Sequence, residues 1–219
     1  MSVRTTTYVS LGAQAVTGAL GLRGLLKSVP DEHVILKRLL AIETFVNAVE
    51  FCFYVWFVRN EPGNMAAIRY FDWVLTTPCM LFTTTAYMIY SERKERGEST
   101  VMTIGEHVKE HGPVLLWLYL SNFLMLFFGF LGETGRMDRS RACLISFAFF
   151  YATFRTLYDR FARRSVVGRR LGMIMTSIWA VYGVAFLFPD VQKNIAFNGL
   201  DIFSKNFFAV YLWREIERL

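Results

Sequence analysis

The chain has 219 residues, of which 54% are hydrophobic and 19% are charged. This apolar content exceeds that of an ordinary soluble domain, so the charged residues have to be segregated between apolar runs. The net charge of +6 would fit nucleic-acid binding if the basic residues formed a surface patch. They gather instead at the ends of apolar runs, so we expect no nucleic-acid partner. The cysteines all lie inside apolar runs and imply no disulfide framework.

Seven apolar stretches are long enough to cross a bilayer, which takes about 20 residues. The links between them are short, so consecutive helices are expected to be antiparallel neighbours. Lys and Arg concentrate at one set of helix ends, which predicts a cytoplasmic C-terminus and an N-terminus outside. The sequence therefore predicts an all-α membrane protein with one domain over residues 1–219, a seven-helix bundle in contact with lipid, and not an enzyme. The predicted helices cover residues 6–26, 34–58, 65–90, 113–131, 142–161, 171–188 and 192–213.

The second stretch carries two acids. Glu43, Asn47 and Glu50 are spaced by four and three residues, so they share one helix face. Acids at membrane depth are costly unless they meet water or a partner. They would serve either as polar clamps between helices or as part of a cation pathway, because acidic groups along a pore favour cations. Further polar residues that would line such a pathway are Ser10 and Gln14 on the first stretch and Asn194 and Asn198 on the last.

The third stretch carries a second set of ions. Residues 69–78 read Arg-Tyr-Phe-Asp-Trp-Val-Leu-Thr-Thr-Pro. Arg69 and Asp72 are three residues apart, and Asp72 and Thr76 are four apart, so they lie on one face. Thr83 continues this face two turns further on, and no acid or histidine lies within two turns of it on this helix.

The last stretch holds one lysine, Lys205, inside the apolar run of residues 200–213. An ionisable group at that depth indicates a functional site with a partner, and Asp201 lies one turn earlier on the same face. The two residues form either an ion pair that holds helices in register or a covalent attachment point. A lysine in an apolar pocket can form a Schiff base with an aldehyde, and Asp201 would then be its counter-ion.

These motifs together resemble the microbial (type 1) rhodopsin family. The resemblance rests on Arg-Tyr-x-Asp-Trp-x-x-Thr-Thr-Pro at 69–78, Trp-x-x-Tyr at 179–182 and Asp-x-x-x-Lys at 201–205. The next residue after the tyrosine is commonly proline in the family and is Gly183 here. The resemblance implies all-trans retinal on Lys205 as a protonated Schiff base. It also implies roles for eight other residues: counter-ions Asp72 and Asp201, their companions Arg69 and Thr76, and a retinal pocket formed by Trp73, Thr77, Trp179 and Tyr182.

Outward proton pumps of this family carry a carboxylate at the position of Thr83, and their extracellular release carboxylate is matched here by Lys193. The paired glutamates at positions 43 and 50 are more similar to channelrhodopsins and to the group 1 viral rhodopsins of large algal viruses. That resemblance implies a light-gated cation channel among helices one, two, three and seven, sensitive to calcium in some members. The alternatives are a light-driven proton pump of low turnover and a sensory photoreceptor.

The viral resemblance further implies the membrane of a virus-infected cell. Monovalent cations or protons are the expected transported partners, and homo-oligomerisation is left open. No metal site is firmly predicted. Because Arg69 and Lys205 are expected to pair with Asp72 and Asp201, Glu43 and Glu50 are expected to have no basic partner. Asn198 is expected to hydrogen-bond one of these glutamates.

Overall fold

The computed structural model describes residues 1–219 and contains helices but no strands. A π-helical segment, Ile202–Asn206, joins α7 to α8, so these three pieces form one continuous seventh rod. The prediction of a seven-helix all-α bundle is therefore confirmed. Short 3-10 turns, Asp31–His33 and Ala162–Arg164, precede α2 and α6. The helices are α1 Val3–Leu26, α2 Val34–Asn60, α3 Met65–Glu95, α4 Ile104–Glu133, α5 Arg139–Arg160, α6 Val166–Ala185, α7 Asp190–Asp201 and α8 Phe207–Glu217.

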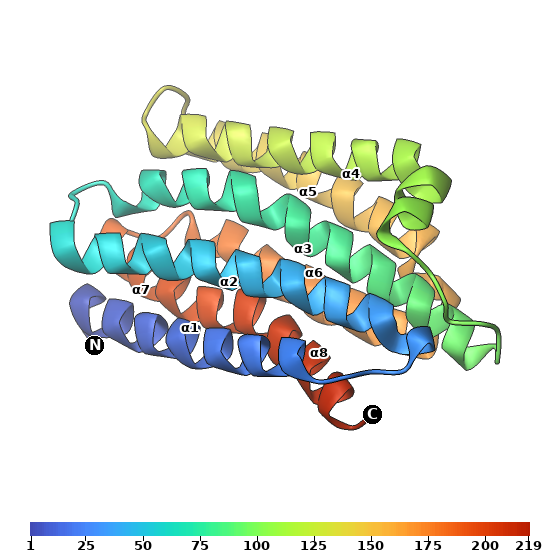
Figure 1. The fold of residues 1–219 in the computed structure, drawn as a ribbon. Coiled ribbons are helices and arrows are strands. Elements are labelled where there is room, and N and C mark those ends of the chain that lie inside the picture. The colour runs from blue at the N-terminus through green and yellow to red at the C-terminus, as the bar shows by residue number, and fades with distance from the viewer.

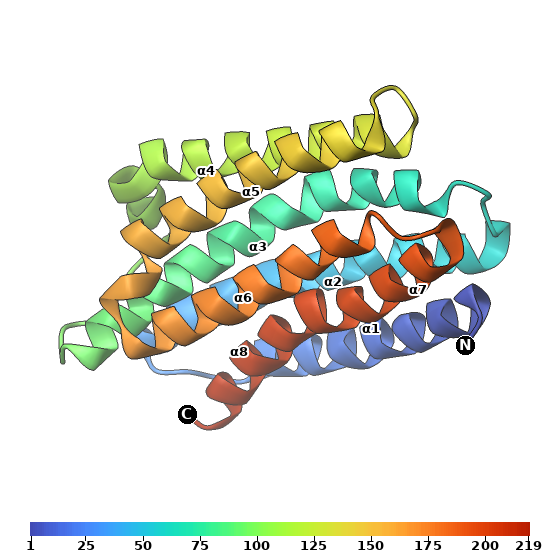
Figure 2. The same ribbon diagram turned by 180° about the vertical axis from the view of Figure 1, so that it is seen from behind.

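The rods run roughly side by side and alternate in direction (Figure 1). Helices α4 and α5 form one edge of the bundle, whereas α1 and the α7–α8 rod lie at the other edge. Helices α2, α3 and α6 lie between these edges, as the reverse view also shows (Figure 2). The N-terminus lies at one end of the bundle, and the C-terminus lies at the other, together with the α1–α2, α3–α4 and α5–α6 links.

The polarity of the bundle is that of a protein surrounded by lipid. Large apolar side chains such as Phe71, Leu116 and Leu144 are exposed, whereas Asn47 and Asp201 are buried. By length and composition alone, three helical segments are apolar enough to cross a membrane: α1, residues 31–60 and α4. The other helices carry more charge, and in α3 Arg69 and Asp72 are buried inside the bundle. Ionisable groups in membrane helices are tolerated when they face the bundle interior.

Helix α4 begins nine residues before the predicted position 113, at Ile104. A capping box sets this start: the Thr103 side chain accepts from the Glu106 backbone N–H (3.1 Å), and the Glu106 carboxylate accepts from the Thr103 N–H (2.8 Å). Hydropathy locates the membrane-crossing part of a helix but not its hydrogen-bonded end.

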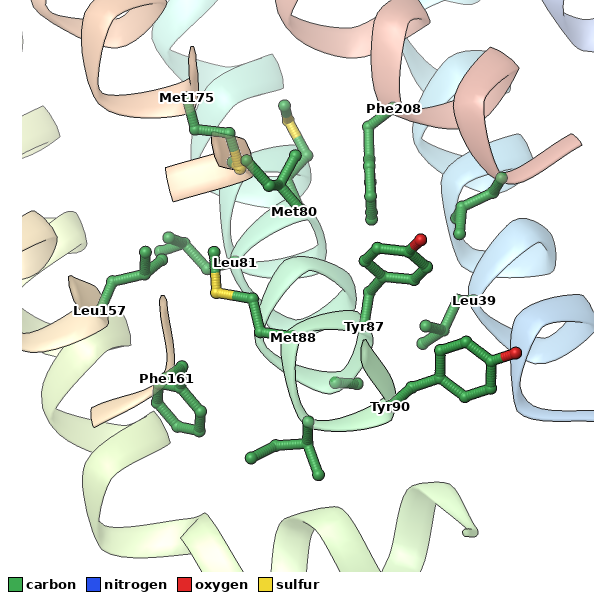
Figure 3. Packing of buried hydrophobic residues seen from close by; sticks show 14 of the residues in the cluster. Leu39, Met80, Leu81, Tyr87, Met88, Tyr90, Leu157, Phe161, Met175 and Phe208 are labelled. Carbon is green, nitrogen blue, oxygen red and sulfur yellow. The ribbon is translucent and has the colours of Figure 1, made fainter. Parts of the chain in front are cut away.

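The end of the bundle that holds the C-terminus is filled by apolar side chains (Figure 3). Leu39 of α2, Tyr87 of α3 and Phe208 of α8 meet there, and the rings of Tyr87 and Phe208 pack edge to face with centroids 5.7 Å apart. Leu36 and Leu40 extend the same buried cluster. We refer to these five residues as the apolar layer.

The close packing of α4 on α5 yields a stability prediction. A Cβ atom at Gly132 would lie 2.5 Å from the Ala142 Cβ and 2.9 Å from the Phe186 ring. Gly132→Ala should therefore lower the free energy of unfolding by about 1–3 kcal/mol, as overpacking does. Gly12→Ala is the control, because no atom lies within 4 Å of its added Cβ. Denaturation in detergent measures the free energy of unfolding of both variants. An equal change in the two variants would contradict the prediction.

Candidate functional site

Lys205 is presented from the π-helical segment at the centre of the bundle, and its side chain is 2% exposed. A π-helical turn contains one more residue per hydrogen-bonded ring than an α-helical turn, and such turns are frequent at functional sites. The sequence predicted an uninterrupted helix here. The extra residue changes the faces on which Lys205 and Asn206 lie relative to the residues of α7.

Three carboxylates surround the Lys205 amine. Its Nζ atom contacts the Asp72 carboxylate directly, lies 3.1 Å from Oε1 of Glu50 and 3.7 Å from Oδ1 of Asp201. All four side chains are buried. The structure thus brings together the two predicted counter-ions and adds a third acid, from α2.

The expectation that Glu43 and Glu50 have no basic partner was wrong for Glu50. The two glutamates share a face of α2 but lie two turns apart, and Glu50 is level with Lys205. Glu43 has no basic partner and accepts a hydrogen bond from the Thr83 hydroxyl instead. Thr83 stands where outward proton pumps of the family carry a carboxylate on helix three. Here it contacts a carboxylate that α2 supplies.

Arg69 pairs across the bundle with Asp201, with Nη1 2.6 Å from Oδ2. Its position one turn from Asp72 on α3 does not make the two a pair, because the long side chain extends toward the seventh rod. Asp201 also accepts hydrogen bonds from the hydroxyls of Tyr54 (2.7 Å) and Tyr182 (2.7 Å). Three donors from α2, α3 and α6 therefore hold this carboxylate.

Asn198 binds neither glutamate, contrary to the expectation. Its amide oxygen accepts from Arg69 and Tyr54, and its amide nitrogen donates to the hydroxyls of Thr6 (2.7 Å) and Thr7 (3.1 Å). It therefore links the Arg69–Asp201 pair to α1.

A second cluster of buried polar side chains is centred on Asn47. Asn47 donates to the side-chain oxygens of Gln14 and Asn206, the latter at 2.9 Å. The Ser10 hydroxyl donates to the backbone carbonyl of Asn198 (2.6 Å). The predicted polar residues of α1 and α2 thus meet the seventh rod. Asn194 lies apart from this group and donates to the Asp190 backbone carbonyl (2.9 Å).

The predicted pocket residues Trp73, Thr77, Trp179 and Tyr182 all line one cavity together with Lys205. The cavity has a volume of about 110 Å³, which is several times the volume that one water molecule needs. Of the 18 lining residues, 12 are hydrophobic. An apolar cavity with one amine suits an apolar aldehyde such as retinal.

Two predicted positions have local roles that spacing did not indicate. The Thr76 hydroxyl donates to the backbone carbonyl of Asp72 (2.9 Å), not to its carboxylate. Gly183 leaves room for the ring of Phe147, which would lie 2.6 Å from an added Cβ. A glycine at this position therefore lets an aromatic ring close the cavity wall.

Lys193, predicted at the start of the seventh helix, is fully buried. Its Nζ atom lies 2.5 Å from the Glu133 carboxylate and 2.8 Å from Asp190. Arg139 approaches both acids, at 3.9 and 3.8 Å. Glu133, Asn206 and Tyr54 were not predicted as site residues. Only Tyr54 carried a signal, because it lies one turn beyond Glu50 on the same face.

Comparison with known proteins identifies the class. The family described as bacteriorhodopsin-like protein matches residues 4–219, and the chain belongs to that family. No curated protein matches. Among solved structures, viral rhodopsin OLPVRII is 22% identical with a TM-score of 0.82, covering 99% of this chain and 98% of that one. The thermophilic rhodopsin from Rubrobacter xylanophilus is 15% identical with a TM-score of 0.78, covering 98% and 96%.

The bromide-bound halorhodopsin from Halobacterium salinarum is also similar, at 15% identity and a TM-score of 0.71, covering 97% of this chain and 92% of that one. At these identities the likeness to solved structures establishes the fold. Family membership establishes an integral, multi-pass membrane protein that is not an enzyme. Members bind retinal through a lysine Schiff base and perform light-driven ion transport or light sensing.

The Lys193–Glu133 pair yields a second stability prediction. Removing one partner of a buried ion pair leaves an uncompensated charge, which costs about 3–5 kcal/mol. Glu133→Gln should approach the lower value, because Asp190 still faces Lys193. Glu61→Gln is the control: its pair with Arg4 is exposed (62% and 71%), and solvent screening leaves it with little effect on stability. Thermal unfolding of both variants measures the effect. Equal shifts of the two unfolding midpoints from the wild-type value would contradict the prediction.

Proposed function

We propose that this protein is a light-gated cation channel in which retinal is bound to Lys205 as a protonated Schiff base, with Asp72 and Asp201 as counter-ions. Bound retinal supplies visible absorption and a change of shape on isomerisation. The observation that carries the proposal is a series of buried polar side chains that runs along α1, α2 and the seventh rod past Lys205 and stops at the apolar layer.

The outer part of the proposed path begins between α1 and α7. Asn194 lies one turn before Asn198, which is hydrogen-bonded to Thr6 and Thr7. Arg69 lies next along the path and contacts both Asn198 and Asp201. The amide and hydroxyl oxygens of these asparagines and threonines can replace part of the hydration shell of a cation, whereas the Arg69 guanidinium has only donors.

The middle of the path is the Asn47 group. Asn47 holds Gln14 of α1 and Asn206 of the seventh rod, and Asn206 is the neighbour of Lys205 in the chain. A displacement of the Lys205 side chain would therefore be transmitted to Asn206 and would loosen the contact between α2 and the seventh rod. This coupling supports gating by light.

The inner part of the path contains Glu43, bonded to Thr83, and is then closed by the apolar layer. Apolar constrictions close a pore because water leaves them. The buried carboxylate on one side and the apolar layer on the other fit a closed state that excludes cations until the helices separate.

A weak outward proton pump is the second candidate, and one observation favours it. The contact between Glu43 and Thr83 supplies a carboxylate, from α2, at the level where pumps of the family carry one on helix three. Calcium sensitivity and the membrane of a virus-infected cell are further proposals, which rest on the resemblance to viral rhodopsins.

Lys205→Ala should give a protein that inserts into the membrane but has no visible absorption, because the amine that binds retinal is gone. Lys193→Arg, at the other buried lysine of the seventh rod, should keep its colour. Absorption spectra of both purified proteins with added retinal provide the measurement. Visible absorption of Lys205→Ala that survives denaturation would place the attachment elsewhere.

The channel itself is tested by whole-cell photocurrent against voltage, with external sodium exchanged for a large impermeant cation and with calcium varied. A channel gives current that reverses with the cation gradient. Glu43→Gln should reduce the current severalfold or alter selectivity, with a nearly unchanged visible spectrum. Current that stays outward at every voltage and ignores the gradient would establish pumping instead.

A further inference from the structure

The positive and negative charges of the central ion cluster are not equal in number. It contains two cations, Lys205 and Arg69, and three acids, Asp72, Asp201 and Glu50. All five side chains are buried, at 4% exposure or less. Helix α1, which packs against α2, adds no charge, because it has no charged residue between Arg4 and Arg23. If every acid were ionised, one uncompensated negative charge would remain buried in the bundle, and such a group takes up a proton instead.

Hydrogen bonds indicate which acid this is, since donors to a carboxylate favour its ionised form. Asp201 accepts from Arg69, Tyr54 and Tyr182. Asp72 accepts from Lys205. Neither oxygen of Glu50 accepts a hydrogen bond, although Lys205 lies 3.1 Å away.

Attachment of retinal increases the difference in hydrogen-bond donors between Glu50 and the two aspartates. A free lysine ammonium has three N–H donors, whereas the same nitrogen in a protonated Schiff base has one. The shorter contact of Lys205 is with Asp72, so the single donor serves Asp72. Glu50 then has no donor at all.

We propose that Glu50 holds a proton in the resting state, an inference that rests on the proposed attachment of retinal at Lys205. The cluster is then neutral, with two cations facing two carboxylates. Glu50 is also four residues from Tyr54 and three from Asn47, so it joins the counter-ion cluster to the proposed ion path. While Glu50 is protonated, no net charge at this point attracts cations.

The visible spectra of Glu50→Gln and Asp72→Asn in the retinal-bound protein provide the first test. Glutamine is a neutral isostere of a protonated glutamate, so Glu50→Gln should absorb at nearly the wild-type wavelength. Asp72→Asn removes a counter-charge and should absorb further to the red. A red shift of Glu50→Gln as large as that of Asp72→Asn would mean that Glu50 is ionised, and the proposal would fall.

Infrared spectra of the resting wild-type pigment and of two matched variants provide the second test. A carbonyl stretch of a protonated carboxylic acid should shift in deuterated water and on carbon-13 labelling of glutamate, but not of aspartate. The band should persist in Glu43→Gln, the matched control, and should persist at another frequency in Glu50→Asp. A band that follows aspartate labelling, or the absence of any glutamate band in Glu43→Gln, overturns the proposal.

The two proposals fail in different ways. If wild type forms no pigment, or if Lys205→Ala retains a covalently bound pigment, the attachment site is wrong. If wild type forms a Lys205-dependent pigment that lacks the Glu50 band, only the protonation of Glu50 is wrong.

Discussion

The contact of the Lys205 amine with buried carboxylates is the interaction on which the rest of the structure depends. A charge in the middle of a membrane bundle needs partners, because neither lipid nor dry protein solvates it. Here the partners come from two other helices, α2 and α3, and from the preceding turn of the same rod. Helices that supply these partners are held in one register, and the cavity beside the amine takes its shape from that register.

Asp201 extends this constraint to a fourth helix. It joins Arg69 of α3, Tyr54 of α2 and Tyr182 of α6 through hydrogen bonds, and Arg69 leads on to Asn198 and α1. Helix association in a membrane lacks the hydrophobic driving force that acts in water, so packing and interhelical hydrogen bonds carry more of the specificity. The same polar groups that position Lys205 therefore also hold the bundle together, and the proposed ion path would use groups that the fold already requires.

Spacing along the sequence predicted which residues share a helix face, and the motifs predicted Asp72 as a counter-ion of Lys205 and Trp73 as part of a retinal pocket. The partners across helices were not predictable in this way. Glu43 and Glu50 share a face, yet one meets Thr83 and the other meets Lys205, because the register between α2 and its neighbours decides the partner. The π-helical segment and the burial of Lys193 were also missed, since both depend on tertiary packing and neither changes the hydropathy pattern.

The distinction between a channel and a pump depends on how many barriers the polar series contains. A pump needs two barriers that never open together, whereas a channel needs one that opens. In this bundle the polar groups continue from Asn198 past Lys205 to Glu43, and the proposed path then meets the apolar layer, in which Tyr87 is the one residue with a polar side-chain group. Tyr87 lies within that layer, but its hydroxyl is bonded to Tyr211 at 2.8 Å and is directed toward α8. The apolar layer formed by α2, α3 and α8 borders the rod that carries Lys205, so movement of this one rod would act on the proposed attachment site and on the proposed barrier together.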